Sequence, residues 1–230
     1  MKNIIQVAGV RNQRDLDILL SCGVDYIGFP FRLSHHREDI SKQEAARLIG
    51  QIPPTSKAVL ITYLGDAAKI QVLSDYLKVK AVQLHGDISL KELSILRKKA
   101  PRLEIIKSLI IGIESWSGLE DRIEQYSPFT HAFITDTFDR KSGAQGATGK
   151  THDWEISRRI VERSPKPVIL AGGLNPTNVK QAIEQVRPAG VDAHTGLEDP
   201  QGNKDAKKVK AFVTKARQTF QKLITNKKAT

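Results

Sequence analysis

Residues 167–186 read PVILAGGLNPTNVKQAIEQV and contain the unit from which the fold can be inferred. The first part, Pro167–Gly172, is an almost continuous apolar run, as expected for a strand of a parallel sheet that is buried on both faces. The second part, Pro176–Val186, has apolar residues at steps of three and four, which predicts an amphipathic helix. Asn175 before Pro176 is a typical helix start. The stretch therefore predicts one βα unit.

The same succession of strand and helix recurs along the whole chain. Eight βα units in 230 residues favour an α/β fold of the (β/α)8 TIM-barrel type, as a single domain over residues 1–230 with a basic C-terminal helix and tail at about 203–230. A doubly wound sheet is less favoured, because its glycine-rich loop would follow the first strand, where Gly9 stands alone. Ser41 with Glu44, and Ser89 with Glu92, predict capped helix starts. The expected strands are Ile4–Gly9, Val24–Phe29, Lys57–Tyr63, Ala81–His85, Glu104–Ile110, His131–Asp136, Pro167–Gly172 and Gly190–His194, and the expected helices are Gln13–Ser21, Lys42–Ile49, Asp66–Tyr76, Leu90–Lys99, Ile113–Gln125, Asp153–Ser164, Pro176–Val186 and the basic C-terminal helix.

Composition excludes several classes of protein. The chain is 40% hydrophobic and 27% charged, and no apolar run reaches the ~18 residues of a membrane span. The N-terminus is too short in apolar residues for a signal peptide, so we expect a cytoplasmic protein. The single cysteine, Cys22, excludes an internal disulfide and is expected to be a small buried residue.

The net charge of +11 is concentrated at one end of the chain. Residues 201–230 contain nine Lys and Arg residues against one acid, Asp205. The same segment carries an apolar stripe with helical spacing, including Val209, Phe212 and Phe220. We therefore expect a packed terminal helix with a solvated basic face rather than a nucleic-acid or membrane-binding element.

Active sites of (β/α)8 barrels lie at the C-terminal ends of the strands, which gives a short set of candidate residues. Asp136 ends the sixth predicted strand and precedes a glycine-rich loop, an arrangement suited to acid–base chemistry on a phosphorylated substrate. An acidic turn before a flexible surface loop is the alternative. The loops after the seventh and eighth strands, AGGLNP and HTGLED, offer backbone N–H groups to an anion. These positions predict a phosphate site.

Neither a metal site nor a nucleotide P-loop is expected. His35 and His36 are adjacent, so their side chains diverge in an extended loop, and the chain has no cysteine pair to accompany them. The sequence GATGKT at 146–151 ends like a P-loop, but the first glycine of that motif would fall on Ala144.

Six motifs occur in order at the predicted strand ends: VDYIGF (24–29), VQLHG (82–86), FITDT (133–137), GATGKTHDW (146–154), ILAGGLNPTNV (169–179) and GVDAHTGLED (190–199). With them the chain resembles phosphoribosylanthranilate isomerase from about Ile4 to Phe212. This enzyme of tryptophan biosynthesis converts N-(5-phosphoribosyl)anthranilate by an Amadori rearrangement, an aldose-to-ketose isomerisation. The resemblance implies a barrel of the ribulose-phosphate-binding type, a phosphorylated small-molecule substrate, no cofactor, and a monomer or homodimer.

The resemblance also implies roles for individual residues. Asp136 matches the general acid that protonates the furanose ring oxygen. Arg37 matches an arginine that contacts the anthranilate end of the substrate, and His85 falls at a position of the substrate pocket. The remaining matches are Gly149 in the loop that covers the site, and Gly172, Gly173, Thr195 and Gly196 around the phosphate.

The chain departs from the family at the first strand. The family has a Lys-Ile-Cys-Gly type motif whose cysteine is the general base, whereas this chain has Gln6-Val7-Ala8-Gly9. Ala8 cannot transfer a proton, and Cys22 is expected at the opposite end of the barrel. Histidines occupy two other family positions, His36 after the second strand and His194 after the eighth. Either could replace the base or bind an anion, and the alternative for each is a solvated or hydrogen-bonded loop histidine.

Two functions are therefore compatible with the sequence. The first is an isomerase that acts on phosphoribosylanthranilate or a related sugar phosphate, with Asp136 as acid and a relocated base. The second is a catalytically impaired paralogue that binds a phosphorylated ligand or regulates a partner through its basic end. The retained acid favours the enzyme, because a carboxylic acid has little use in a pure binding protein.

Overall fold

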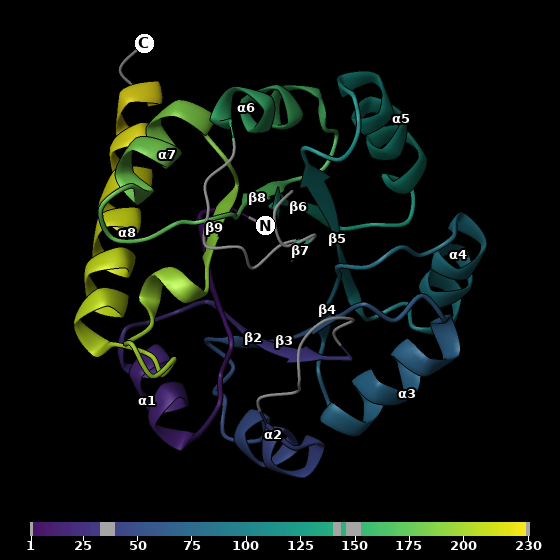
Figure 1. Cartoon of the computed structure of the whole chain (residues 1–230), viewed down its shortest axis with the longest axis horizontal. Helices are drawn as coiled ribbons and strands as arrows, with labels where there is room; N and C mark the ends of the chain where they lie inside the picture. The colour runs from purple at the N-terminus through teal and green to yellow at the C-terminus, as the bar shows by residue number, and fades with distance from the viewer. Residues whose placement is uncertain (1, 33–39, 140–143, 146–152, 229–230) are drawn as a thin grey trace.

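The computed structural model describes residues 2–32, 40–139, 144–145 and 153–228 (Figure 1). Its sheet has the strand order β5-β4-β3-β2-β1-β9-β8-β6-β7, and a further pairing of β5 with β6 closes the ring. All pairings within the ring are parallel, so the predicted (β/α)8 barrel is confirmed. The strands of the ring are β1 (Ile4–Ala8), β2 (Tyr26–Phe31), β3 (Lys57–Thr62), β4 (Ala81–Leu84), β5 (Glu104–Ile111), β6 (Ala132–Asp139), β8 (Val168–Leu170) and β9 (Gly190–Ala193).

The strands bury both of their faces, which explains their almost continuous apolar sequences. One apolar cluster fills the barrel and includes Ala8, Ile106, Ile134 and Ala171. A larger cluster lies between the strands and the surrounding helices. Figure 1 shows these helices as an outer ring around the barrel. They are α1 (Gln13–Ser21), α2 (Lys42–Ile49), α3 (Ala67–Leu77), α4 (Leu90–Lys99), α5 (Trp116–Tyr126), α6 (Trp154–Arg163), α7 (Val179–Val186) and α8 (Ala206–Lys228).

The predicted helix caps at Ser41 and Ser89 are confirmed, since each hydroxyl accepts a hydrogen bond from the backbone N–H three residues later. The predicted start of α7 at Pro176 is wrong by three residues. Asn175 and Asn178 instead close a polar turn, in which the Asn175 N–H donates to Asn178 Oδ1 over 2.9 Å. The helix therefore begins only after this turn.

The prediction that the sixth strand ends at Asp136 is also wrong. β6 continues to Asp139 and pairs antiparallel with the two-residue strand β7 (Ala144–Gln145). This hairpin pairing extends the strand by three residues beyond the acid. Asp136 therefore lies within a strand, which fixes its backbone more firmly than a turn would.

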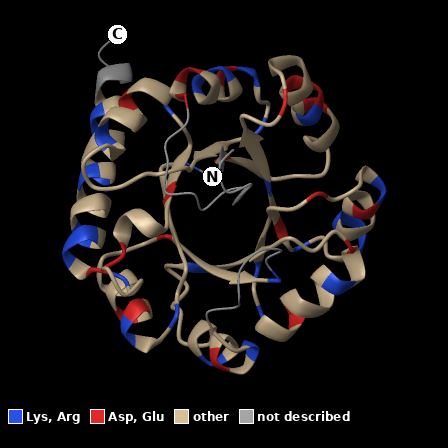
Figure 2. Ribbon diagram, viewed as in Figure 1, with Lys and Arg blue, Asp and Glu red and all other residues tan. Residues whose placement is uncertain are grey.

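The basic C-terminal helix docks on the barrel as predicted, but its charges are not all solvated. Lys204, which precedes α8, is fully buried. Lys208 and Lys215 donate to the carbonyl oxygens of Glu198 and Pro176, and Arg217 pairs with Asp25, the residue before β2. Figure 2 shows the Lys and Arg residues spread along α8. Much of this charge anchors the helix to the barrel.

Cys22 ends α1 at the bottom of the barrel, opposite the C-terminal strand ends. It packs against the outer apolar cluster but is half-buried rather than buried, so that expectation is only partly correct. Across the described part of the chain, no helix combines the length and apolar character needed to cross a membrane.

Candidate active site

Asp136 points into the barrel mouth from β6, and its side chain is 13% exposed. His85 lies after β4 on the same inner face, with Nε2 3.7 Å from Asp136 Oδ2. The hydroxyl of Ser108 on β5 lies 2.9 Å from the other ring nitrogen, Nδ1. The backbone N–H of Thr137 donates to Asp136 Oδ1 over 2.7 Å. The carboxyl therefore lies against His85 and the Thr137 N–H, and Ser108 contacts the far ring nitrogen of His85.

Tyr63, after β3, completes this side of the mouth. Its ring centroid lies 4.9 Å from that of His85. Burial, followed by the charge of Asp136, raises the pKa of the Tyr63 hydroxyl above its ordinary value. The phenol therefore stays protonated and can act only as a hydrogen-bonding group at neutral pH.

A buried polar layer lies beneath the mouth. Gln6 on β1 donates to Gln83 on β4 over 2.7 Å, across the inside of the barrel. Asp192 on β9 is 9% exposed, and burial and the charge of Asp136 raise its pKa to about 7. Among the described residues, neither Asp192 Oδ1 nor Gln6 Oε1 has a hydrogen-bond partner. Sequence reasoning missed Asp192, although an acid inside the apolar strand sequence GVDA was an available signal.

The first and last strands of the barrel bring Ala8 and His194 to neighbouring strand ends. β1 pairs with β9 in the register Gln6 with Asp192 and Val7 with Ala193, so the next residues in line are Ala8 and His194. Gly9 has a φ of +84°, and a Cβ built on it would lie 2.1 Å from His194 Nε2. The imidazole therefore lies directly over Gly9, beside the position that lacks the cysteine.

Glu198 and Lys204 form a charged pair behind His194. Glu198 Oε1 lies 3.2 Å from His194 Nε2 and 2.8 Å from Lys204 Nζ. Although burial opposes ionisation, His194 and Lys204 together lower the pKa of Glu198 to about 2. Glu198 is thus a carboxylate at any working pH. Sequence reasoning included Glu198 only as part of the HTGLED loop and missed Lys204, because their contact depends on the fold of the loop between β9 and α8.

The four predicted phosphate residues lie in two loops that touch each other. Gly172 and Gly173 both have positive φ, +97° and +63°. Thr195 and Gly196 begin the 3-10 turn η1 (Thr195–Leu197), and a Cβ on Gly196 would lie 2.2 Å from the carbonyl oxygen of Leu174. Among the described residues, no turn, loop or side-chain hydrogen bond uses the backbone N–H of these four positions. They are available to an anion.

Other predicted site residues lie outside the described part of the chain, namely His35, His36, Arg37 and Gly149. Within the described part, no group of three or more His, Cys, Asp or Glu residues could hold a metal ion.

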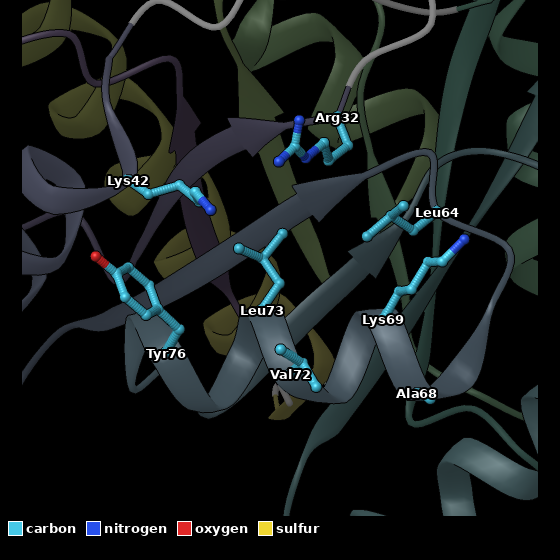
Figure 3. Close-up of a pocket in the computed structure, with 8 residues that line it drawn as sticks. All are labelled: Arg32, Lys42, Leu64, Ala68, Lys69, Val72, Leu73 and Tyr76. Atoms are coloured by element: carbon cyan, nitrogen blue, oxygen red, sulfur yellow. The ribbon is translucent and has the colours of Figure 1, made fainter.

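A separate groove of about 500 Å³ lies on the outside of the barrel (Figure 3). Val72 and Tyr76 of α3 line it together with Arg32, Lys42 and Lys69. The sticks in Figure 3 come from α3 and the chain segments beside it, and none of the predicted site residues is among them. This groove is therefore distinct from the barrel mouth.

Comparison with known proteins places this barrel in a family. The family model for N-(5'phosphoribosyl)anthranilate (PRA) isomerase matches residues 5–215. "N-(5'-phosphoribosyl)anthranilate isomerase 2" of Methanosarcina mazei is 40% identical over 221 residues, covering 95% of this chain and 96% of the relative. The crystal structure of phosphoribosyl anthranilate isomerase from Thermotoga maritima has a TM-score of 0.79 and 29% identity, covering 94% of this chain and 98% of that one.

A further crystal structure shows a phosphoribosyl anthranilate isomerase in complex with reduced 1-(o-carboxyphenylamino)-1-deoxyribulose 5-phosphate. It superposes with a TM-score of 0.77 at 28% identity, covering 94% of this chain and 98% of that one. The family match spans nearly all of the barrel, including every strand end described above. The chain belongs to the N-(5'-phosphoribosyl)anthranilate isomerase family.

Proposed function

We propose that the chain catalyses the isomerisation of N-(5'-phosphoribosyl)anthranilate to the corresponding 1-deoxyribulose 5-phosphate. The observation that carries this proposal is Asp136, held in the barrel mouth by His85 and Thr137, in the same mouth as a pair of loops with free backbone N–H groups. The family of the chain and the ligand of its solved relative supply the substrate.

Asp136 is the general acid in this proposal. It gives its proton to the furanose ring oxygen as the bond between that oxygen and C1 breaks, and the nitrogen lone pair forms the C=N bond of a Schiff base. A general base then removes the proton on C2, and the resulting enaminol tautomerises to the ketone. Such positioned acids and bases typically contribute about 10²–10⁴-fold each.

The phosphate of the substrate occupies the two touching loops in this proposal. The N–H groups of Gly172, Gly173, Thr195 and Gly196 surround its oxygens, which needs no metal ion or cofactor. Arg37 and Gly149 are proposed for the anthranilate end and the covering loop on the resemblance alone. We further propose that residues 1–230 form one domain, because α8 packs against both α7 and α1. A monomer or homodimer stays a prediction.

The binding-protein alternative is not carried forward, because no feature of the described residues favours it. Its support was the missing cysteine at Ala8 together with the basic end of the chain. Lys204, Lys208, Lys215 and Arg217 are all engaged with the barrel or its loops, which leaves fewer cations for a nucleic acid or an acidic partner.

The test follows the loss of fluorescence of freshly generated phosphoribosylanthranilate. We expect turnover by the parent protein and a fall in kcat of about 10²-fold or more in Asp136→Asn. Asp75→Asn, which removes an exposed carboxylate from α3, is the matched control. A parent protein that neither turns over the substrate nor binds the reduced product analogue contradicts the proposed function. An Asp136→Asn variant with parental kcat contradicts the role of the acid.

A further inference from the structure

We propose that His194 is the general base of this barrel in place of the absent cysteine, and that Glu198 is its positioning residue. The inference rests on the proposed function, since it assigns the second proton transfer of the isomerisation. It explains how a chain with alanine at position 8 can retain the rest of the site.

The position of His194 is the first argument. It follows β9 directly in line with Ala8 on the neighbouring strand, as the register of β1 and β9 requires. Its ring lies over Gly9, because a Cβ on that glycine would lie 2.1, 2.6 and 3.0 Å from Nε2, Cδ2 and Cε1 of the imidazole. A histidine at this strand end therefore places its imidazole, with Nε2 nearest to Gly9, beside the place of the missing thiol.

Accessibility is the second argument. The side chain of His194 is 27% exposed, whereas Asp192, the nearest titratable residue along β9, is 9% exposed and lies one residue pair deeper, opposite Gln6. Cys22 lies at the other end of the barrel. Among the described residues near Ala8, His194 is the titratable group that a substrate in the mouth can reach.

The charge of Glu198 is the third argument. Its carboxylate faces Nε2 at 3.2 Å, which favours the tautomer with the proton on Nε2 and leaves Nδ1 as the acceptor. The contact of His194 with Glu198 uses Nε2 and therefore does not occupy Nδ1. When Nδ1 takes up a proton, the carboxylate also stabilises the imidazolium.

The loop that carries this pair is fixed to the start of the chain. Lys204, fully buried, holds Glu198 Oε1 over 2.8 Å, and its own backbone N–H donates to Asp15 Oδ1 over 2.8 Å. The same Asp15 accepts from the backbone N–H of Arg11, two residues after Gly9. The loops that follow β1 and β9 are thus connected, so the imidazole needs little reorganisation before it acts.

The proton transfer balances without any co-reactant. Nδ1 takes the proton from C2 of the Schiff base, and the electron pair of the broken C–H bond forms the C1–C2 double bond. The π electrons of the protonated C=N bond return to nitrogen, which becomes neutral. The positive charge moves from the substrate to the imidazole, next to Glu198.

The experiment measures kcat and KM with freshly generated phosphoribosylanthranilate. We expect His194→Asn to lower kcat by about 10²–10⁴-fold with a KM close to that of the parent. His131→Asn is the matched control, because His131 lies at the end of β6 opposite the barrel mouth. Its Nδ1 accepts a hydrogen bond from the backbone N–H of Ile105. Adding Ala8→Cys to His194→Asn is expected to restore much of the lost kcat, since the thiol returns to the strand beside the histidine.

Each other outcome overturns either the proposal or the proposed isomerase function on which it rests. A parental kcat in His194→Asn overturns the proposal. A loss of kcat in His36→Asn but not in His194→Asn also overturns it. An inactive parent that gains activity with Ala8→Cys leaves the isomerase site intact but removes His194 as a base. Inactivity of both the parent and Ala8→Cys refutes the proposed function itself.

The role of Glu198 has its own test. Glu198→Gln is expected to lower kcat about 10-fold in the parent, but to have little further effect in the His194→Asn, Ala8→Cys double variant, where a thiol is the base. Equal losses in the two backgrounds would assign Glu198 a structural role and overturn this part of the proposal.

Discussion

Asp192→Asn tests the electrostatics of the barrel interior through stability. Burial raises the pKa of the Asp192 carboxyl from 3.8 to about 7. The folded protein therefore keeps this proton between about pH 4 and pH 7 while the unfolded chain releases it, so the stability contribution falls as pH rises through that interval. At about 1.36 kcal/mol per pKa unit, the full destabilisation above pH 7 is on the order of 4 kcal/mol. Asparagine has nearly the same shape and carries no charge, so it removes this cost.

The assay is urea unfolding at pH 5 and pH 8, followed by the fluorescence of Trp116 and Trp154. Relative to the parent, Asp192→Asn is expected to gain about 2.6 kcal/mol in its free energy of unfolding between the two pH values, since most of the interval lies between them. Asp75→Asn, which changes an exposed carboxylate, is the control and is expected to show no comparable gain. A difference between Asp192→Asn and the parent that is the same at both pH values would refute the reasoning.

Three further substitutions test the architecture of the mouth. Gly9→Ala is expected to destabilise the protein by about 1–2 kcal/mol through the positive φ of this position, and to lower kcat by displacing His194 from above it. Gly23→Ala, with φ +71° and open space around it, is expected to cost only the backbone strain. Unfolding curves and kcat measured for both variants separate the two effects. Gly196→Ala, whose Cβ would lie 2.2 Å from a backbone oxygen, is expected to raise the inhibition constant of inorganic phosphate about 10-fold, measured by competition. Lys204→Met is expected to cost about 3 kcal/mol in urea unfolding, because it leaves a partly buried carboxylate without its cation.

Local features of the sequence were sufficient to predict most of the barrel. Ser41 and Ser89 cap their helices as predicted, and α1, α2 and α4 have the predicted bounds, because periodicity and capping act within a few residues. The β7 hairpin was not predictable in the same way. Two residues are too few for a recognisable strand pattern, and their pairing with the end of β6 depends on how the loop between them closes.

The candidate site shows a similar limit. Asp136 could be found from its place after an apolar run, since the strand ends of a barrel share one face. The burial of Lys204 could not be predicted, because it depends on the ion pair with Glu198, a residue in a loop without periodicity. Counting lysines in the C-terminal segment therefore overestimated the solvated charge.

The two departures from the family pattern at Ala8 and His194 gain their meaning only from the fold. They are far apart in the sequence, yet the parallel pairing of β1 with β9 makes them neighbours at one edge of the mouth. A side chain can be lost from one strand and its function supplied from the next, provided that the backbone between them leaves room. Gly9 provides that room, since any larger residue there would occupy the space of the imidazole. The small residue at position 8 and the histidine at position 194 therefore form one structural arrangement, made possible by the glycine at position 9, rather than two separate changes.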